Sequence, residues 1–415
     1  MSTTFELVYA VILFLAIYIQ VFFLLLFFEH KKKISPKNIT PTLAESEKLS
    51  VTFLLPAWNE SKTVCGTIQS ILTVDYPKDK LHIIVIDDGS KDDTWEILQQ
   101  YKDHSQITLI HKENGGKFTA LNAALPYVKT DLVASFDADT KIEPNALHKA
   151  VPHFVHDPEL MALGGTVLID HPKSFAQKAQ EIEYQTFSFT KKMLGFAGAV
   201  LVVPGAFAMF RKEVFDKVGG YRHAYLLEDA ELTMRLHSHG FKIDHCHDAI
   251  VWTKGPTTVK GLFKQRLRWS YGFIKNAVDY RYMFLNHKYG NFGMFTLPMS
   301  VAAYVLLVFI FSYSVYKVSI ALIATIQKII LVGWGGFEFG RWDPFFFDTK
   351  ATTIMSLFIY TAIITGFFLG RYISRIKKKN FHNIPYFIVV YGYIAPFWVM
   401  KSIYSWIFGK KVTWR

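Results

Sequence analysis

Two carboxylates separated by one residue are the first feature of this sequence that can do chemistry. Asp137 and Asp139 directly follow the apolar run from Leu132 to Phe136, so they lie where a buried strand leaves its sheet. On a turn at that spacing both carboxylates can face one divalent ion. Hard oxygen ligands suit Mg²⁺ or Mn²⁺, and either ion neutralises a diphosphate leaving group. The same residues can instead form a turn and a helix N-cap without any metal.

A second acidic pair, Asp87 and Asp88, ends another apolar run at 82–86. Alone, Asp-Asp-Gly-Ser is typical of a β-turn followed by an N-cap. Coupled to the end of the preceding strand, it can hold a uracil and a ribose through backbone and carboxylate hydrogen bonds. The candidate nucleotide-binding residues on that strand end are Pro56, Ala57 and Glu60.

Three further segments offer charged or aromatic groups. Lys117, behind the Gly-rich turn at 114–116, is a candidate phosphate contact, with a plain surface lysine as the alternative. Asp229 lies at an acidic helix start, where acids also stabilise the helix dipole, and it is the candidate general base for an acceptor hydroxyl. Gln265, Arg268 and Trp269 share one helical face. That face suits a diphosphate beside a sugar ring and also suits an interfacial helix at lipid headgroups.

Histidine and cysteine spacings point less strongly to a metal. His245 and His247 flank Cys246, and His237 lies two residues from His239, but no further His or Cys grouping completes a site. The alternation at 245 and 247 is satisfied by a surface strand. The chain has 2 cysteines, which excludes a disulfide framework and a four-cysteine zinc site. A bound metal is therefore expected to use oxygen or histidine ligands.

Strands and helices alternate around the candidate residues. Apolar runs at 51–55, 82–86, 107–110 and 132–136 are separated by turns and helical patterns. Such alternation predicts an α/β fold with a mostly parallel sheet, in which ligands bind at the carboxyl ends of the strands. Both acidic pairs lie at such ends.

The remaining segments have the composition of membrane anchors. Hydrophobic residues make up 51% of the 415 residues and charged residues only 19%, which disfavours disorder and a purely cytosolic enzyme. Four uncharged stretches reach spanning length, at 7–28, 289–316, 351–370 and 380–400. We expect an N-terminal transmembrane helix at 1–30, a cytosolic domain at 31–290 and a C-terminal transmembrane region at 291–415.

Flanking cations predict the orientation of these spans. The lysines at 31–33 and the cations at 371–379 are both expected in the cytoplasm. With four spans, the cations at 410–415 fall outside, against the same rule. The stretch at 381–408, interrupted by Lys401, can therefore instead be re-entrant or form two short segments. The net charge of +12 suits an anionic inner leaflet and a diphosphate donor, so nucleic-acid binding is not needed to explain it.

The motifs occur in the order D-D-G (87–89), D-x-D (137–139), E-D (228–229) and Q-x-x-R-W (265–269), in one domain between membrane spans. This order resembles the processive family 2 glycosyltransferases, which include cellulose, chitin, hyaluronan and poly-N-acetylglucosamine synthases. In length and layout the chain is most similar to the bacterial poly-β-1,6-N-acetylglucosamine synthases. The resemblance implies a nucleotide-sugar-binding fold of the family A glycosyltransferase type.

The resemblance also implies roles for individual residues. Asp87 and Asp88 would contact the nucleotide, Asp137 and Asp139 the metal, and Asp229 would be the catalytic base. Gln265 and Arg268 would bind the diphosphate, and the acceptor would lie against Gly205, Glu228 and Trp269. Two departures concern fine substrate assignment: Leu227 stands where the family usually has Thr, and Lys254-Gly255 precede Pro256 where an acidic residue is common.

The implied activity is metal-dependent, inverting transfer from a UDP-sugar, expected to be UDP-N-acetylglucosamine, to a growing β-linked exopolysaccharide. The implied location is the bacterial inner membrane, with the catalytic domain in the cytosol and a small membrane accessory subunit as partner. The alternatives are a synthase of another β-glycan and a non-processive enzyme that glycosylates a lipid. A membrane subunit that binds a sugar nucleotide without turnover is the alternative from another class.

Overall fold

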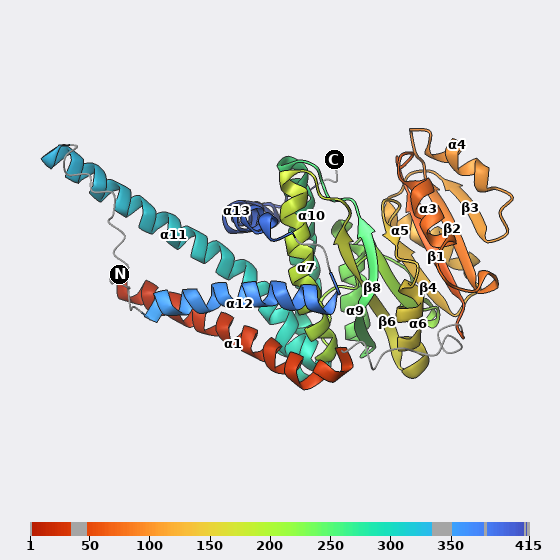
Figure 1. Ribbon diagram of the computed structural model, residues 1–415, viewed down its shortest axis with the longest axis horizontal. Helices are drawn as coiled ribbons and strands as arrows, with labels where there is room; N and C mark the ends of the chain where they lie inside the picture. The colour runs from red at the N-terminus through yellow and green to blue at the C-terminus, as the bar shows by residue number, and fades with distance from the viewer. Residues whose placement is uncertain (1, 35–47, 334–350, 377–379, 411, 413–415) are drawn as a thin grey trace.

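The computed structural model describes residues 2–34, 48–333, 351–376, 380–410 and 412. These residues contain an eight-stranded sheet in the order β3-β2-β1-β4-β7-β6-β8-β5 (Figure 1). The strands are β1 (Val51–Ala57), β2 (Leu81–Asp88), β3 (Ile107–Lys112), β4 (Leu132–Phe136), β5 (Lys141–Ile142), β6 (Leu160–Ile169), β7 (Phe207–Arg211) and β8 (Lys242–Thr253).

The expected mixed, mostly parallel sheet is confirmed. Strands β1 to β4 pair in parallel, as do β6 and β8. Strand β7 lies between β4 and β6 and runs antiparallel to both, and β5 is antiparallel to β8. The four apolar runs named from the sequence are β1 to β4. Strand β1 continues through Pro56 to Ala57, two residues beyond the expected end.

The central strands are buried on both faces, which explains their continuous apolar sequences. In β1, Phe53 and Leu55 face one core cluster while Leu54 faces the other, as the two-residue strand period requires. The helices that cover the first face are α3 (Val64–Leu72), α4 (Thr94–Leu98) and α6 (Ala146–His156). Those that cover the second face are α5 (Lys117–Ala124), α8 (Glu213–Val218) and α9 (Glu228–Ser238).

Two long helices, α7 (Phe175–Phe196) and α10 (Val259–Asp279), stand between the sheet and the apolar helices (Figure 1). Polar side chains on α7 hold this junction together. Glu183 accepts from Arg266 of α10 at 2.6 Å, and Gln185 accepts from Arg371 at 3.2 Å. Arg371 is a cation at the end of the third apolar stretch, and it is buried in this junction.

The apolar helices are α1 (Ser2–Ile34), α11 (Leu297–Val332), α12 (Ala351–Ile373), α13 (Ile384–Val389) and α14 (Ala395–Ile407). Within the described residues, three stretches are long and apolar enough to cross a membrane: Leu7–Lys32, Phe292–Val332 and Phe381–Ile407. They correspond to the first, second and fourth stretches expected from the sequence. The third is helical as α12, and part of its side chains lie outside the described set.

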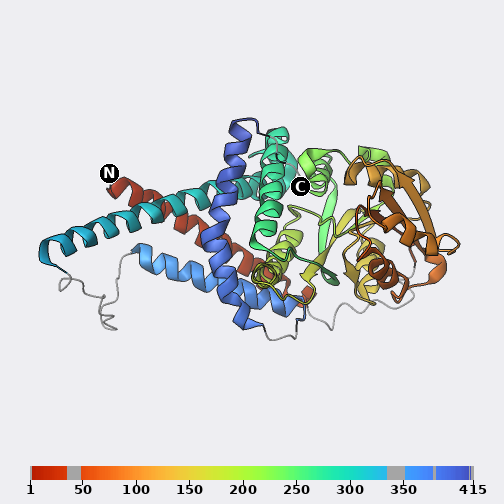
Figure 2. The ribbon, with the colours of Figure 1, turned by 90° about the horizontal axis from the view of Figure 1, so that it is seen from above.

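The apolar helices do not all run the same way. Helices α1, α11 and α12 extend to one side, away from the sheet, whereas α13 and α14 run across them (Figures 1 and 2). Leu267 of α10 and Trp398 of α14 belong to one core cluster, so this crosswise segment packs on α10. The polar stretch at 35–47 and the cations at 377–379, 411 and 415 lie outside the described residues.

Candidate active site

The ends of β1 and β2 meet as the sequence predicts. Ala57 pairs with Asp87 in the parallel register, so Pro56, Ala57 and the acidic pair at 87–88 share one edge of the sheet. Asp87 is fully buried; one of its carboxylate oxygens lies 2.7 Å from Nδ1 of His111, and the other has no hydrogen-bond partner among the described residues. A buried carboxylate oxygen without a donor is suited to a ligand donor such as a nucleoside N–H or hydroxyl.

Asp88 organises the neighbouring glycine turn. Its carboxylate accepts from the backbone N–H groups of Gly115 and Gly116 at 3.1 and 2.8 Å and from Nζ of Lys112 at 2.6 Å. Gly116 has φ +90°, a conformation that favours glycine. The carboxylate therefore holds the turn that leads into Lys117, while its predicted contact with the nucleotide stays a prediction.

Asp137 and Asp139 lie where β4 leaves the sheet, beside Glu60. Asp139 accepts from the hydroxyls of Thr253 and Thr140 at 3.2 and 3.3 Å. Burial, then the carboxylates of Asp137 and Glu60, raise the pKa of Asp139 to about 7. Excess negative charge at a buried position is the condition that a bound cation relieves.

This acidic edge fits a divalent ion held jointly with a ligand. Within the part of the chain that the structure describes, no group of three or more His, Cys, Asp or Glu side chains is arranged to hold a metal alone. Mg²⁺ commonly takes one or two carboxylates and completes its shell with substrate phosphates and water. Asp137 and Asp139 supply that number of carboxylates, and the raised pKa of Asp139 reflects burial and the neighbouring carboxylates of Asp137 and Glu60.

Lys117 connects the acidic edge to the E-D motif. Its Nζ lies 2.5 Å from Asp137 and 3.4 Å from Glu228. Burial opposes its charge, but Asp137 and then Glu228 hold the pKa of Lys117 above its ordinary value. The lysine is therefore a fixed cation within the site rather than an isolated surface lysine.

Asp229 is the second residue of α9 and lies in the first turn of that helix. Its carboxylate accepts from the backbone N–H of Ala230 at 2.8 Å and from that of Gly205 at 3.1 Å. Burial, followed by the charge of Glu228, raises the pKa of Asp229. A raised pKa makes the carboxylate a stronger base, as proton abstraction requires.

Strand β7 brings Gly205 to this place. Phe207 at the start of β7 pairs with Phe136, the last residue of β4, so the loop before β7 runs beside the D-x-D motif. A side-chain carbon at Gly205 would lie 2.9 Å from Nζ of Lys117 and 3.5 Å from Oδ2 of Asp229. Glycine here lets the backbone approach both charged groups.

Helix α10 places the basic residues around the same centre. Arg268 donates to the carbonyl of Leu226, just before the E-D motif, at 2.6 Å. Burial lowers the pKa of Arg268, while the negative charges of Glu228, Asp229 and Asp137 act in the opposite direction. Gln265 accepts from Gln180 of α7 at 2.9 Å.

Trp269 rests on a residue that the sequence analysis missed. The guanidinium of Arg266 lies 4.3 Å from the centre of the Trp269 ring and forms a buried ion pair with Glu183 at 2.6 Å. The only sequence signal for Arg266 was its place inside the Q-x-x-R-W motif, and the sequence around Glu183 gave no signal. The pair positions the indole expected to contact the sugar.

One expectation about the histidines was wrong. His245 and His247 lie in β8 and are both buried, not on a surface strand. Strand β8 is covered by α6 and α7, which removes the solvent face that the alternation had suggested. Burial lowers the pKa of His247 to about 4, so this side chain is neutral near pH 7.

The family model described as "Glycosyltransferase like family 2" matches residues 49–272, more than half of the chain. The chain belongs to glycosyltransferase family 2. This segment contains the D-x-D edge, the E-D helix and most of α10. The protein is thus a glycosyltransferase by family, with the fold that its motifs indicated.

Individual relatives agree with this assignment. The chain is 33% identical over 275 residues to the poly-β-1,6-N-acetyl-D-glucosamine synthase of Staphylococcus aureus strain COL, covering 66% of either chain. It is 29% identical over 354 residues to the synthase of that name from Staphylococcus epidermidis, covering 85% of this chain and 81% of the relative. A mannosyltransferase from Pyrobaculum calidifontis, solved with GDP-Man and Mn²⁺, has the same fold, with 19% identity, a TM-score of 0.59, and coverage of 86% of this chain and 98% of that chain.

Proposed function

We propose that this glycosyltransferase polymerises N-acetylglucosamine from UDP-N-acetylglucosamine into a β-linked exopolysaccharide, with inversion at the anomeric carbon. The arrangement that carries the proposal is the bridge of Lys117 between Asp137 at 2.5 Å and Glu228 at 3.4 Å. It brings the expected diphosphate side and the expected acceptor side to one centre. The names of the two staphylococcal relatives support the choice of sugar.

In this proposal Asp229 takes the proton of an acceptor hydroxyl, whose oxygen forms a bond to the anomeric carbon from the face opposite the diphosphate. The bond from that carbon to the diphosphate oxygen breaks, and UDP leaves with the electron pair. Arg268 and Lys117 stabilise the charge that develops on the diphosphate. A Mg²⁺ or Mn²⁺ ion held by Asp137 and Asp139 would add further positive charge there.

The remaining predicted contacts complete the proposal. Pro56, Ala57, Glu60, Asp87 and Asp88 line the nucleotide side, with Gln265 beside the diphosphate. Gly205, Glu228 and Trp269 line the acceptor side. We place the catalytic domain at 31–290 in the cytosol of a bacterium, between a membrane helix at 1–30 and a membrane region at 291–415, with a small membrane subunit as partner.

The first test measures UDP release and product size for the purified full chain in detergent with Mg²⁺ or Mn²⁺. UDP-N-acetylglucosamine, UDP-glucose and UDP-glucuronate are supplied separately. We expect a long polymer from UDP-N-acetylglucosamine. A polymer from another donor would identify a different β-glycan synthase, and a single transfer to lipid would identify a lipid glycosyltransferase.

The second test is Asp229→Asn, which keeps the shape of the side chain but removes the base. We expect transfer to fall by about 10²–10⁴-fold while UDP binding is retained. Asp216→Asn, on the exposed side of α8, is the matched control and should keep full activity. Unchanged transfer in Asp229→Asn would reject this residue as the base.

A further inference from the structure

A second cavity lies beside the catalytic helix and is not part of the site described above. It has a volume of about 530 Å³, and its lining includes Arg222 and Tyr225 before α9, Glu231 on α9, Asn276 and Asp279 on α10, and Tyr282 in the turn after α10 (Arg281–Met283). Small-molecule sites commonly have about 300–1,000 Å³. Asp229, Arg268 and Trp269 do not line it.

The aromatic side chains of this cavity form a connected wall. The rings of Tyr280 and Tyr282, which both line the cavity, lie 5.9 Å apart, and Tyr282 packs at 5.7 Å on Tyr289 just outside the lining. Tyr282 is 51% exposed, so a ligand can reach its ring. Tyrosine offers a flat apolar surface with a polar tip, which matches the apolar face and the hydroxyl rim of a pyranose.

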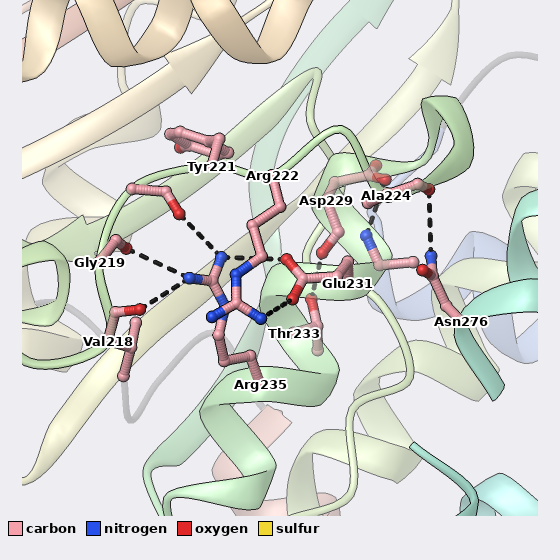
Figure 3. A network of polar contacts seen from close by, with 12 residues as sticks. Val218, Gly219, Tyr221, Arg222, Ala224, Asp229, Glu231, Thr233, Arg235 and Asn276 are labelled. Carbon is pink, nitrogen blue, oxygen red and sulfur yellow. Dashed lines mark hydrogen bonds and ion pairs between the residues drawn. The ribbon is translucent and has the colours of Figure 1, made fainter. Parts of the chain in front are cut away.

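The charged side chains of the cavity are largely paired with one another. Glu231 accepts from the hydroxyl of Tyr280 at 2.6 Å and from Arg235 at 3.0 Å, and Arg222 lies 3.5 Å from the same carboxylate. Figure 3 shows the carboxylate of Glu231 facing the guanidinium groups of both Arg222 and Arg235. Asp279 adds a second carboxylate, so the lining has no excess of positive charge for a phosphate.

The wall of the cavity leads directly into the E-D motif. Ala224, Tyr225 and Leu226 have φ of 44°, 55° and 65°, a left-handed conformation that L-residues rarely adopt in succession. Asn276 donates to the carbonyl of Ala224 at 3.4 Å, and Tyr225 donates its hydroxyl to Asp279 at 3.0 Å. A ligand in this cavity therefore contacts the turn that precedes α9, the helix that carries the proposed base Asp229.

We propose that this cavity binds a neutral oligosaccharide, separate from the acceptor site at Trp269. The aromatic wall, the paired charges and the exposed carboxylate of Asp279 are the chemistry that recognises a sugar. The identity of the sugar rests on the proposed function, which makes a primer or product chain of N-acetylglucosamine the occupant.

The test titrates short β-1,6-linked N-acetylglucosamine oligosaccharides into the full chain in detergent, with binding followed by calorimetry. We expect Tyr282→Ala to weaken oligosaccharide binding by about tenfold, which is the loss of one stacking contact. The affinity for UDP should not change. Tyr127→Ala, another exposed tyrosine but far along the chain from this cavity, should bind like the wild type. Asp279→Asn should also weaken the binding of the oligosaccharide.

Kinetics separate this proposal from the proposed function. Wild-type UDP release from UDP-N-acetylglucosamine tests the activity, and the effect of Tyr282→Ala on the KM for added oligosaccharide tests the cavity. We expect that KM to rise while the KM for the donor is unchanged. If the wild type turns over UDP-N-acetylglucosamine but Tyr282→Ala binds the oligosaccharide as tightly as the wild type does, the cavity proposal alone is overturned. Binding that depends on Tyr282 without any turnover would overturn the proposed function alone. Tighter binding of inorganic phosphate than of oligosaccharide would make the cavity an anion site and overturn the inference.

Discussion

The charge of Glu228 contributes, after burial, to the raised pKa of its neighbour Asp229. After burial, Glu228 is the main cause of the raised pKa of Asp229. Catalysis by the base needs its ionised form, so the raised pKa moves the acid limb of kcat/KM to higher pH. Glu228→Gln removes that charge, and we expect the acid limb to move to lower pH even if the maximal rate falls.

The measurement is a pH profile of UDP release for wild type, Glu228→Gln and the control Glu213→Gln. Glu213 is an exposed residue of α8 that pairs with Lys217. An acid limb in Glu228→Gln that coincides with the wild type would contradict the assignment of that limb to Asp229.

Asp139 makes the acidic edge sensitive to pH and to metal. Its pKa is about 7, compared with an ordinary value of 3.8. The folded protein therefore holds a proton that the unfolded chain releases, and the stability of the metal-free protein falls as the pH rises from about 4 to 7. A divalent ion bound at this edge would replace that proton, so we expect its stabilising effect to be larger at pH 8 than at pH 5.

We expect Asp139→Asn to raise the Tm of the metal-free protein at pH 8 and to abolish the upward shift caused by Mn²⁺. Each 1 kcal/mol corresponds to about 2–4 °C for a domain of this size. Thermal unfolding in detergent, with Mn²⁺ or a chelator, measures both effects. A full Mn²⁺ shift in Asp139→Asn would place the metal at other ligands.

At the scale of elements, the loop before β7 can lie next to Lys117 and Asp229 because Gly205 has no side chain. A methyl group there would lie 2.9 Å from Nζ of Lys117, which is closer than a carbon can approach without displacement. We expect Gly205→Ala to lower transfer more than tenfold by moving Lys117 and Asp229, with a small change in Tm.

Gly66→Ala is the matched control for this substitution. A methyl group at Gly66 meets only Lys141 at 3.8 Å, and the residue lies inside α3. Alanine in a helix interior stabilises by roughly 0.5–1 kcal/mol relative to glycine. We expect Gly205→Ala to lose activity with a small change in Tm, and Gly66→Ala to keep its activity with a higher Tm. Equal activity in the two variants would contradict the place of Gly205 in the site.

At the scale of the whole molecule, the crosswise direction of α13 and α14 changes the expected topology. Helices α13 and α14 run across α1, α11 and α12 (Figure 2). If α1, α11 and α12 cross the membrane while α13 and α14 lie along its surface, the segments that follow α12 and α14 in the sequence share one side. That arrangement satisfies the positive-inside rule at both places, which four spans do not.

Reporter fusions measure this topology. We expect green fluorescent protein at the C-terminus to fluoresce and alkaline phosphatase at the same point to be inactive, whereas phosphatase inserted after Gly333 should be active. A phosphatase that is active at the C-terminus would support four spans.

The limits of sequence-based prediction follow from particular elements. Strands β1 to β4 were predicted because their apolar runs are bounded by turns. Strands β6 and β7 were not, and β8 was expected only as a surface strand around 245–247. Buried polar residues such as His245 and Asp248 interrupt the apolar pattern of β8. Glu183 and Arg266 were missed because a buried ion pair between two helices leaves no local signal.

By itself, the sequence determined the fold class and named the candidate groups for the chemistry, since hydrophobic period, turn residues and motif order are local properties. Only the tertiary structure decided that Lys117 bridges Asp137 and Glu228 and that Gly205 donates to Asp229. Those contacts join residues that are distant in the chain. They depend on the insertion of β7 between β4 and β6, an order of strands that no local pattern specifies.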